Sequence, residues 1–430
     1  MLTPAHFQSI AMLAVLLVAF YAMARRGVAQ AIAMPLAASA FLALSLTHAK
    51  EITESAFRDF GPVAILFTAV AVPAHMIERS NASTWLGAAL GTQIGWLRLR
   101  TELAVHLLVF VLLLITFIAA ALFHNITSIM VMVPITITIC SQYGIPTRWL
   151  LSGQLIASNL GGFSTSWGDT PNIIERTAWS LTNRDFTLEI LPVNLGVLGL
   201  LTIAVIPLTR SAMRDRIDNV RIAIARASQR LERMYIVVDK RLLLVGLSTL
   251  ALFITLQWVN RELELAAAAI TIAIAVLADR PEDRLRSLQA LDLDLYMVLG
   301  SIFVLARAVD KSLIGESLAR LVRDAGGAPF VIAISAYFGT LLTEAASWAS
   351  ATAPAVHVVN ASHAGAWSLG AGICAGSSSL LTAASAGLVL WSQSRRFAGH
   401  EVNFGRYLTF GLPASLVMLV LYIMYFTIVR

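Results

Sequence analysis

The chain has few charged residues and few cysteines. Asp, Glu, Lys and Arg make up 13% of its 430 residues, about half of the roughly 25% that soluble domains carry. Its two cysteines, Cys140 and Cys374, stand in apolar surroundings and have neither disulfide-framework nor metal-ligand spacing. The catalytic motifs HExxH, GxSxG and CxxC are missing from the sequence. We therefore expect neither an enzyme nor a protein that depends on a cofactor.

Long hydrophobic runs dominate the sequence. Hydrophobic residues make up 58% of the chain, and the mean hydropathy is +0.76. The runs are longer than the ~10 residues of a barrel strand, and many approach the ~20 residues with which a helix crosses a bilayer. They predict an all-α polytopic membrane protein with about ten crossings. The apolar segments lie at 9–24, 28–47, 61–77, 103–123, 125–141, 150–181, 190–208, 242–259, 263–278, 294–309, 328–343, 345–359, 367–394 and 405–428.

Positive charge is concentrated between hydrophobic segments. The longest basic stretch, 209–241, is predicted to be a cytoplasmic loop, because Lys and Arg favour the cytoplasmic side of a membrane. We favour a solvated linker there over a helix lying on the membrane surface. Aromatic residues are not interleaved with the basic ones, so we expect no nucleic-acid partner. The lipid bilayer of a bacterial cytoplasmic (inner) membrane, or of a compartment derived from it, is the expected surrounding.

The most polar stretch inside a hydrophobic segment runs from Ser158 to Glu175 and reads SNLGGFSTSWGDTPNIIE. It contains five Ser or Thr, two Asn, one Asp, three Gly and one Pro. Backbone that leaves a helix within a bilayer is tolerated only where protein or a water-filled cavity surrounds it. In transporters such broken helices carry substrate and ion sites. The stretch therefore predicts a binding site at membrane depth.

The same order of features occurs twice along the chain. A polar residue stands ten positions before a proline in each half: His124 before Pro134, and Glu344 before Pro354. Each proline is followed further on by a Gly with hydroxyl residues, at 162–165 and at 376–379. Because the loop charges give the two units opposite directions, we predict two inverted-topology repeats, each with a re-entrant hairpin and a broken transmembrane helix. The predicted division is 1–60 N-terminal transmembrane helices, 61–208 first transport repeat, 209–241 cytoplasmic basic loop, 242–293 connecting transmembrane helices and 294–430 second, inverted transport repeat.

The stretch NLGGFSTSWGDTPNII resembles the signature of the ion transporter superfamily, which includes arsenite permeases, citrate-metal and dicarboxylate symporters and some sodium/proton antiporters. HNITSIMVMVP is similar to that family's first hairpin, and residues 373–390 are similar to its second broken helix. The resemblance implies hairpins and broken helices that move against a scaffold, with a homodimer as a possible assembly. Ala345 and Ala386 stand where members usually carry Asn, which argues against a symmetric pair of sodium sites. Within the superfamily the chain is most similar to the magnetosome MamN branch.

Amide, hydroxyl and carboxylate side chains in the two polar regions are the predicted ion ligands. Such oxygens suit a small hard cation, whereas the N-termini of half-helices suit an anion. Each hydroxyl taken alone is more often a packing group. The predicted substrate- and ion-binding residues are Asn125, Thr127, Ser158, Asn159, Gly161, Gly162, Ser164, Thr165, Asp169, Asn172, Ser378, Ser379, Thr382 and Ser385. We predict no metal site other than Na⁺ at the tips that carry Asn125, Asn159 and Asp169.

Three ionisable residues are candidates for proton coupling: His124, Asp169 and Glu344. Ionisable groups inside a membrane span are costly and mark pathways or proton relays. Two alternatives stay open at this point. Asp169 can cap the following half-helix or cap it and also coordinate a cation or proton, and His124 and Glu344 can carry protons or merely solvate a water-filled mouth.

The leading functional prediction is a secondary active transporter that works by alternating access. It would move an inorganic or small organic ion, with H⁺ or Na⁺ as the coupling ion and H⁺ preferred. The alternatives are a Na⁺/H⁺ antiporter, a magnetosome-membrane transporter of MamN type, and a structural membrane component that transports nothing. The sequence determines neither the identity nor the charge sign of the cargo.

Overall fold

The computed structural model describes residues 4–25, 30–82, 85, 101–143, 145–166, 168–213, 234–259, 264–284, 293–313, 317, 320, 323–324, 326–398 and 402–426. All regular elements within these ranges are helices, so the predicted all-α class is confirmed. The predicted basic loop 209–241 falls largely outside the described residues, because its central part, 214–233, is not among them.

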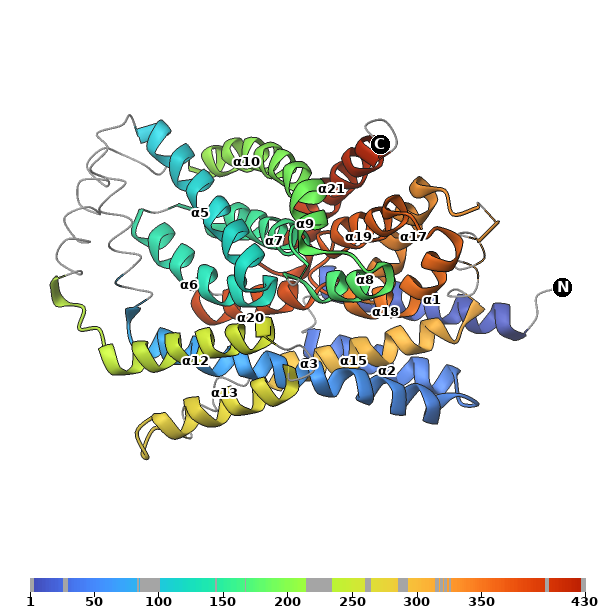
Figure 1. Ribbon diagram of the computed structural model, residues 1–430, viewed down its shortest axis with the longest axis horizontal. Helices are drawn as coiled ribbons and strands as arrows, with labels where there is room; N and C mark the ends of the chain where they lie inside the picture. The colour runs from blue at the N-terminus through green and yellow to red at the C-terminus, as the bar shows by residue number, and fades with distance from the viewer. Residues whose placement is uncertain are drawn as a thin grey trace.

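The helices form two stacked parts (Figure 1). The first, which we call the lower layer, is built around the long helix α3, which contacts α2, α12, α13 and α15. Its members are α2 (Gln30–Leu44), α3 (Ala49–Arg79), α12 (Lys240–Val259), α13 (Glu264–Ala278) and α15 (Leu293–Asp310). Helix α1 (Pro4–Arg25) contacts both α2 and, across the boundary, α21.

The second part, which we call the upper body, contains both polar regions. Helix α5 packs on α7, and α17 packs on α19; α18 lies against α8, and α20 lies against α6. Its members are α5 (Thr101–Phe123), α6 (Asn125–Tyr143), α7 (Thr147–Phe163), α8 (Thr170–Trp179), the short α9 (Asn183–Asp185), the π-helical turn η1 (Phe186–Ile190), α10 (Leu191–Met213), α17 (Pro329–Leu342), α18 (Ala345–Val359), α19 (His363–Ser377), α20 (Ser385–Ala398) and α21 (Phe404–Met424).

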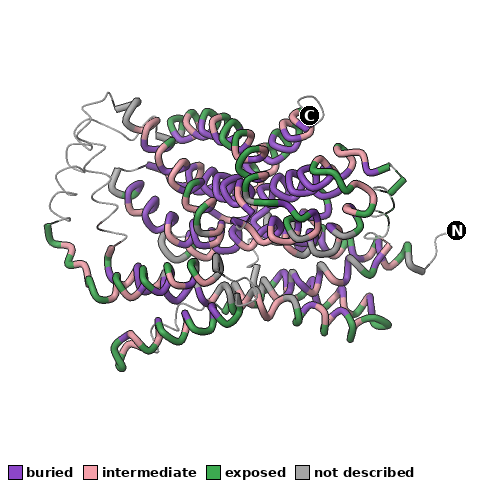
Figure 2. Tube along the Cα trace, viewed as in Figure 1, coloured by how far each residue is buried: buried purple, intermediate pink, exposed green. Residues whose placement is uncertain are grey.

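The core of the upper body lies along α7 and α19. Residues 150–163 of α7 and 365–377 of α19 are buried without exception, as the continuous purple trace in Figure 2 shows. Small residues permit this close packing. A Cβ added at Gly161 would overlap the carbonyl oxygen of Phe117 in α5, and one at Gly376 would lie 2.9 Å from the carbonyl oxygen of Tyr337 in α17. Each of the two polar regions therefore stands on a central, tightly enclosed helix.

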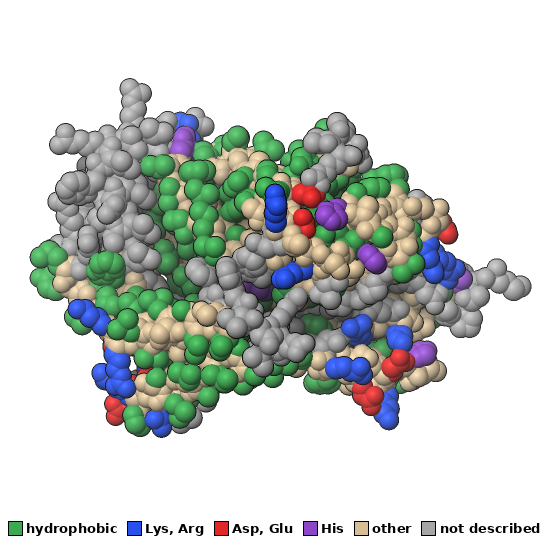
Figure 3. All heavy atoms as spheres, in the orientation of Figure 1, with side chains coloured by type: hydrophobic (Ala, Val, Ile, Leu, Met, Phe, Trp, Pro, Cys, Tyr) green, Lys and Arg blue, Asp and Glu red, His purple; other side chains and the backbone are tan. Residues whose placement is uncertain are grey.

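The outer surface has the character of a membrane protein. Three described segments are long and apolar enough to cross a bilayer, namely Val105–Leu122, Phe186–Ser211 and Phe404–Met424, and shorter apolar helices accompany them. Large apolar side chains such as Ile203 and Leu36, exposed by 67% and 65%, point outward. Hydrophobic side chains cover much of the face in Figure 3, while charged ones lie toward the two ends of the lower layer and in smaller groups on the upper body. The predicted number of about ten crossings stays a prediction.

Candidate functional site

The first polar interruption lies between α7 and α8 and is shorter than the sequence suggests. Helix α7 continues to Phe163, so Ser158, Asn159, Gly161 and Gly162 are all helical, and of the described residues only 164–166, 168 and 169 lie between α7 and α8. The Ser164 hydroxyl donates to the carbonyl of Leu160 at 2.7 Å, and its backbone N–H donates to Gly161. These bonds satisfy carbonyls in the last turn of α7.

Asp169 begins the second half of the broken helix. Its backbone is extended, and its Oδ1 accepts the N–H of Thr170 at 2.8 Å, with Pro171 in the first turn of α8. Both features are typical of a helix start. The capping interpretation of Asp169 is therefore confirmed, and coordination of a cation or proton stays a prediction.

Two predicted ligands of the first break make bonds that hold the loop together. The Asn172 amide donates to the carbonyls of Gly162 at 2.8 Å and Thr165 at 2.6 Å. The Thr165 hydroxyl donates to the carbonyl of Ala121 in α5 at 2.9 Å. The nitrogen of Asn172 and the hydroxyl hydrogen of Thr165 are thus occupied in fixing the backbone, which holds the loop rigid around Asp169.

His124 and Glu344 occupy matching places, each immediately before the second helix of a hairpin. His124 has φ +91°, and its Nδ1 accepts the N–H of Ile126 at 3.4 Å. Glu344 accepts the N–H of Ala346 at 2.9 Å. Each side chain therefore contacts a backbone N–H two residues further along, at the start of α6 or α18.

The backbone contact between hairpin and break also occurs in both regions. The N–H of Asn125 donates to the carbonyl of Gly168 at 2.9 Å, and the N–H of Ala345 donates to Ala383 at 3.1 Å. The second break spans residues 378–384, between α19 and α20. Both hairpin tips are therefore tied to a break by the first N–H of the following helix.

One side-chain hydrogen bond links α7, just before the first break, to the start of the second break. The amide of Asn159 in α7 donates to the hydroxyl of Ser378 at 3.1 Å. Ser378 is further held through its carbonyl, which accepts the hydroxyl of Tyr407 at 2.6 Å. On the hairpin side, the hydroxyl of Ser385 donates to Glu344 at 3.3 Å.

The other predicted hydroxyls are distributed among packing positions. Ser158 donates to the carbonyl of Asn125 at 2.9 Å and lies 2.9 Å from the Ser128 hydroxyl. Ser379 donates to the carbonyl of Gly376 within its own helix end. Thr127 and Thr382 are buried. These residues line or brace the region, and their role as ligands stays a prediction.

Among the predicted ligands, two amide oxygens are left without a donor. Asn125 Oδ1 and Asn159 Oδ1 are buried and accept no hydrogen bond from the residues that the structure describes. A buried polar atom without a partner is costly and calls for an explanation, and a bound cation is one. The donor chemistry fits a hard cation such as Na⁺.

Glu175 is the main site residue that sequence reasoning missed. It stands in α8 with 0% exposure, and within the described chain neither of its carboxylate oxygens has a hydrogen-bond partner. It packs beside Phe163 against α19, where a Cβ added at Gly370 would come into close contact with Glu175 Oε2. Asp169 lies within electrostatic range of Glu175, and Glu344 within range of Asp169. An acid next to two isoleucines in an apolar segment was the available signal.

Asn194 and Tyr422 were also missed. The Asn194 amide donates to the carbonyl of Leu160 and to the hydroxyl of Ser164, both at 2.9 Å. Its oxygen accepts the hydroxyl of Tyr422 at 2.6 Å. Both residues lie on apolar helices, α10 and α21, and they brace the end of α7 just before the break.

A multi-pass helical bundle whose central helices break around buried acids and amides has the architecture of many membrane transporters. The model of the citrate transporter family matches residues 3–384, so the chain belongs to that family and, with it, to the ion transporter superfamily. The resemblance found in the motifs is thereby confirmed.

Individual relatives agree with this family. The chain is 26% identical over 394 residues to the magnetosome protein MamN of Magnetospirillum gryphiswaldense, covering 86% of this chain and 87% of that protein. It is 24% identical over 344 residues to an uncharacterized transporter of Mycobacterium tuberculosis, covering 77% and 79% of the two chains. A second uncharacterized transporter of the same organism is 26% identical over 330 residues, covering 73% and 75%.

Proposed function

We propose that the protein is a secondary active transporter that moves an inorganic or small organic ion across a bacterial cytoplasmic membrane by alternating access, coupled to H⁺. The family name makes citrate and related carboxylates the first cargoes to test. Because the chain is also similar to MamN, a magnetosome membrane derived from the cytoplasmic membrane is a second possible location.

The observation that carries this proposal is that both hairpins contact a break through the same kind of backbone hydrogen bond. A further hydrogen bond, from Asn159 to Ser378, links the two halves. The loop charges orient these two units in opposite directions, which supports inverted repeats with re-entrant hairpins. In that architecture one bundle moves against another around a fixed site. The upper body, with both breaks, is the proposed moving unit, and the lower layer around α3 is the proposed scaffold and the candidate surface for a homodimer.

Proton coupling is supported by the acids around the first break. Asp169 lies within electrostatic range of both Glu175 and Glu344, and ionisable groups inside a membrane span mark pathways or proton relays. A carboxyl that is protonated in one conformation and opens to water in another can release its proton there. We assign Glu175 to this role, since protonation removes the need for a charged partner.

Sodium coupling, and with it Na⁺/H⁺ antiport, is the second candidate. The unpartnered oxygens of Asn125 and Asn159, together with the carboxylate of Asp169, would hold the ion. The third alternative is a structural membrane component without transport activity. It is favoured by the second break, which has hydroxyl and small residues in place of acid and amide.

The proposal can be tested by flux measurements in proteoliposomes. Wild type should show saturable uptake of at least one ion from a panel of citrate, dicarboxylate, arsenite, sulfate, sodium and iron, driven by an imposed pH gradient. Asp169→Asn and Glu175→Gln should reduce this uptake to the level of empty vesicles. Asp324→Asn makes the same chemical change on an exposed residue and should transport like wild type.

The outcome separates the three candidates. Uptake that depends on a sodium gradient and is unchanged by the pH gradient would favour the second candidate, sodium coupling. Absence of flux for every ion in both gradients would contradict transport and favour a structural component.

A further inference from the structure

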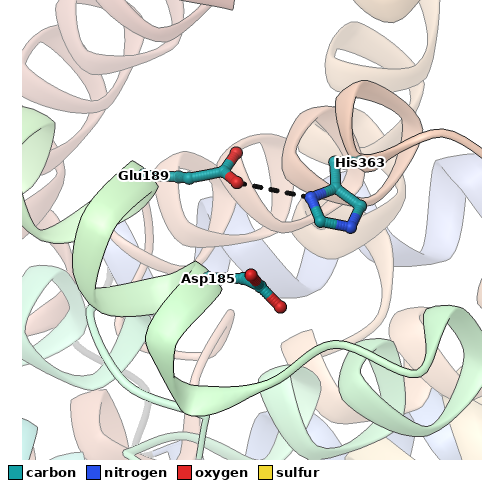
Figure 4. A group of neighbouring side chains, drawn as sticks. All are labelled: Asp185, Glu189 and His363. Atoms are coloured by element: carbon teal, nitrogen blue, oxygen red, sulfur yellow. Dashed lines mark hydrogen bonds and ion pairs between the residues drawn. The ribbon is translucent and has the colours of Figure 1, made fainter.

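A cluster of two acids and a histidine lies outside the region of the breaks. Asp185 ends α9, Glu189 lies in the π-helical turn η1, and His363 begins α19. One potential ligand atom from each of the three residues can be chosen so that all lie within 4.8 Å of one another. Figure 4 shows the two carboxylates and the imidazole ring around a common space.

The closest pair in the cluster has the spacing of two ligands on a tetrahedral metal ion. His363 Nδ1 and Glu189 Oε1 are 3.3 Å apart. Ligands that hold Zn²⁺ at about 2.0–2.1 Å in a tetrahedron stand roughly 3.3 Å from one another. Asp185 and Glu189 are four residues apart, which places them on one side of the helix. The π-helical turn that carries Glu189 is a rare element that often occurs at functional sites.

Neighbouring donors hold both carboxylates in place. Asp185 Oδ2 accepts the N–H and the hydroxyl of Thr182, each at 2.7 Å. Glu189 Oε2 accepts the indole N–H of Trp367 at 2.7 Å. Metal ligands are commonly oriented by such outer hydrogen bonds, which leave a second oxygen directed at the ion. Here Glu189 Oε1 is the oxygen on the side of His363.

We propose that Asp185, Glu189 and His363 form a binding site for a divalent transition-metal ion of the Zn²⁺ class, with its fourth position open to water. An imidazole beside two carboxylates favours Zn²⁺ over Mg²⁺ and Ca²⁺, which prefer all-oxygen ligands. The His363 side chain is 48% exposed, so an ion can reach the site from solvent. The bound ion would link η1 to α19, elements 174 residues apart in the chain.

This site is separate from the proposed transport function and is tested by binding alone. Chelator-stripped full-length protein in detergent is titrated with Zn²⁺ and, separately, with Mg²⁺, against a competing chromophoric chelator. We expect one Zn²⁺ per chain and no comparable binding of Mg²⁺. Asp185→Asn, Glu189→Gln and His363→Asn should each weaken Zn²⁺ binding by at least about tenfold, since loss of an outer-shell partner alone costs that much.

His48→Asn is the matched control, because His48 lies 3.7 Å from Glu51 in an exposed pair within one helical turn. It should bind Zn²⁺ like wild type. Co²⁺ gives a second readout, since a tetrahedral site produces an intense visible spectrum that the three variants should lose while their elution on size exclusion is unchanged. Equal Zn²⁺ affinity in wild type and all three variants, or a loss as large in His48→Asn, would overturn the proposal.

Discussion

The two breaks of the upper body share a backbone arrangement but differ in their side chains. In both regions the first backbone N–H of the second hairpin helix donates a hydrogen bond to a carbonyl of the break. The pairs are Asn125 to Gly168 and Ala345 to Ala383. The first break adds Asp169 and the Asn172 amide, whereas the second, 378–384, contains only hydroxyl and apolar residues. Because the second break keeps its contact without acid or amide, the backbone arrangement alone does not require them. Since the Asn172 amide is occupied within the loop, Asp169 is the group of this break that we propose as a ligand.

The acid of the second region comes from the hairpin instead. Glu344 stands before α18, where the first hairpin has His124, and it lies within electrostatic range of Asp169. Asp169 of the first region and Glu344 of the second thus come from different elements and lie within electrostatic range of each other. This arrangement favours one shared site over two symmetric ones.

The largest effect is expected from Glu344→Gln, compared with His124→Gln at the matching place in the first hairpin. Glu344→Gln should abolish uptake driven by a pH gradient, because it removes an acid from the shared site. His124→Gln should retain uptake and its dependence on pH. His124 Nδ1 accepts a backbone N–H and therefore carries no proton, and a Gln oxygen can accept the same bond. The measurement is the initial uptake rate in proteoliposomes between pH 5.5 and 8, the range that brackets roughly the ordinary pKa of His.

Protein amount and folding are controlled by size exclusion and by the thermal melt of each variant. If His124→Gln loses its pH dependence and Glu344→Gln keeps both uptake and its pH dependence, the place of Glu344 in the shared site is wrong. If both keep it, neither hairpin carries the coupling proton.

A smaller effect is expected from glycines at the ends of the two central helices. Gly161→Ala would push a methyl into the carbonyl oxygen of Phe117, a backbone atom, whereas at Gly376 the nearest atoms are Thr340 Cβ at 2.8 Å and Tyr337 O at 2.9 Å. We expect Gly161→Ala to destabilise the fold by about 3 kcal/mol and Gly376→Ala by about 1 kcal/mol, the ends of the usual range for overpacking. Thermal melts of the purified variants provide the comparison.

Gly196→Ala is the control, since nothing lies within 4 Å of the added Cβ. Its melt should match that of wild type. Equal destabilisation at Gly161 and Gly376 would show that the two helix pairs pack equally closely, against the expected difference.

Local patterns predicted much of this arrangement. The apolar segments 125–141 and 345–359 correspond closely to α6 and α18, and the equivalence of His124 and Glu344 follows from their spacing to a proline. Asp169 before Thr170 and Pro171 indicates a helix start for local reasons as well. Such features depend on neighbours in sequence, which is why the sequence is sufficient to find them.

Features that depend on distant neighbours could not be predicted. Helix α7 extends past Ser158 to Phe163 because the amide of Asn194 supports its last turn, and Tyr422 holds Asn194 from 228 residues away. The burial of Glu175 likewise requires α19 to pack against it, with Gly370 leaving room. Helical periodicity shows which side a residue faces but not which helix will cover that side.

The smallest expected effect concerns the hydrogen bond between Asn159 of α7 and Ser378 of the second break. Asn159→Ala and Ser378→Ala each remove the bond, and the double variant completes a cycle that isolates its contribution. We expect a coupling free energy of about 1 kcal/mol in denaturant unfolding in detergent. Ser378→Ala should cost less stability than Asn159→Ala, because the Ser378 hydroxyl otherwise donates only to Cys374 within its own helix end.

The same cycle, measured on uptake rate, asks whether the two breaks move together. If α7 and α19 move as one unit, the bond persists through transport. The double-variant cycle should then show a coupling free energy in stability, whereas the effects of the two substitutions on uptake rate should be additive. If the breaks separate during each cycle, the bond must open, and its loss should speed the step that separates them. If the coupling in uptake rate is as large as the coupling in stability, the upper body does not move as a single unit. In that case α7 and α19 belong to parts that move relative to each other.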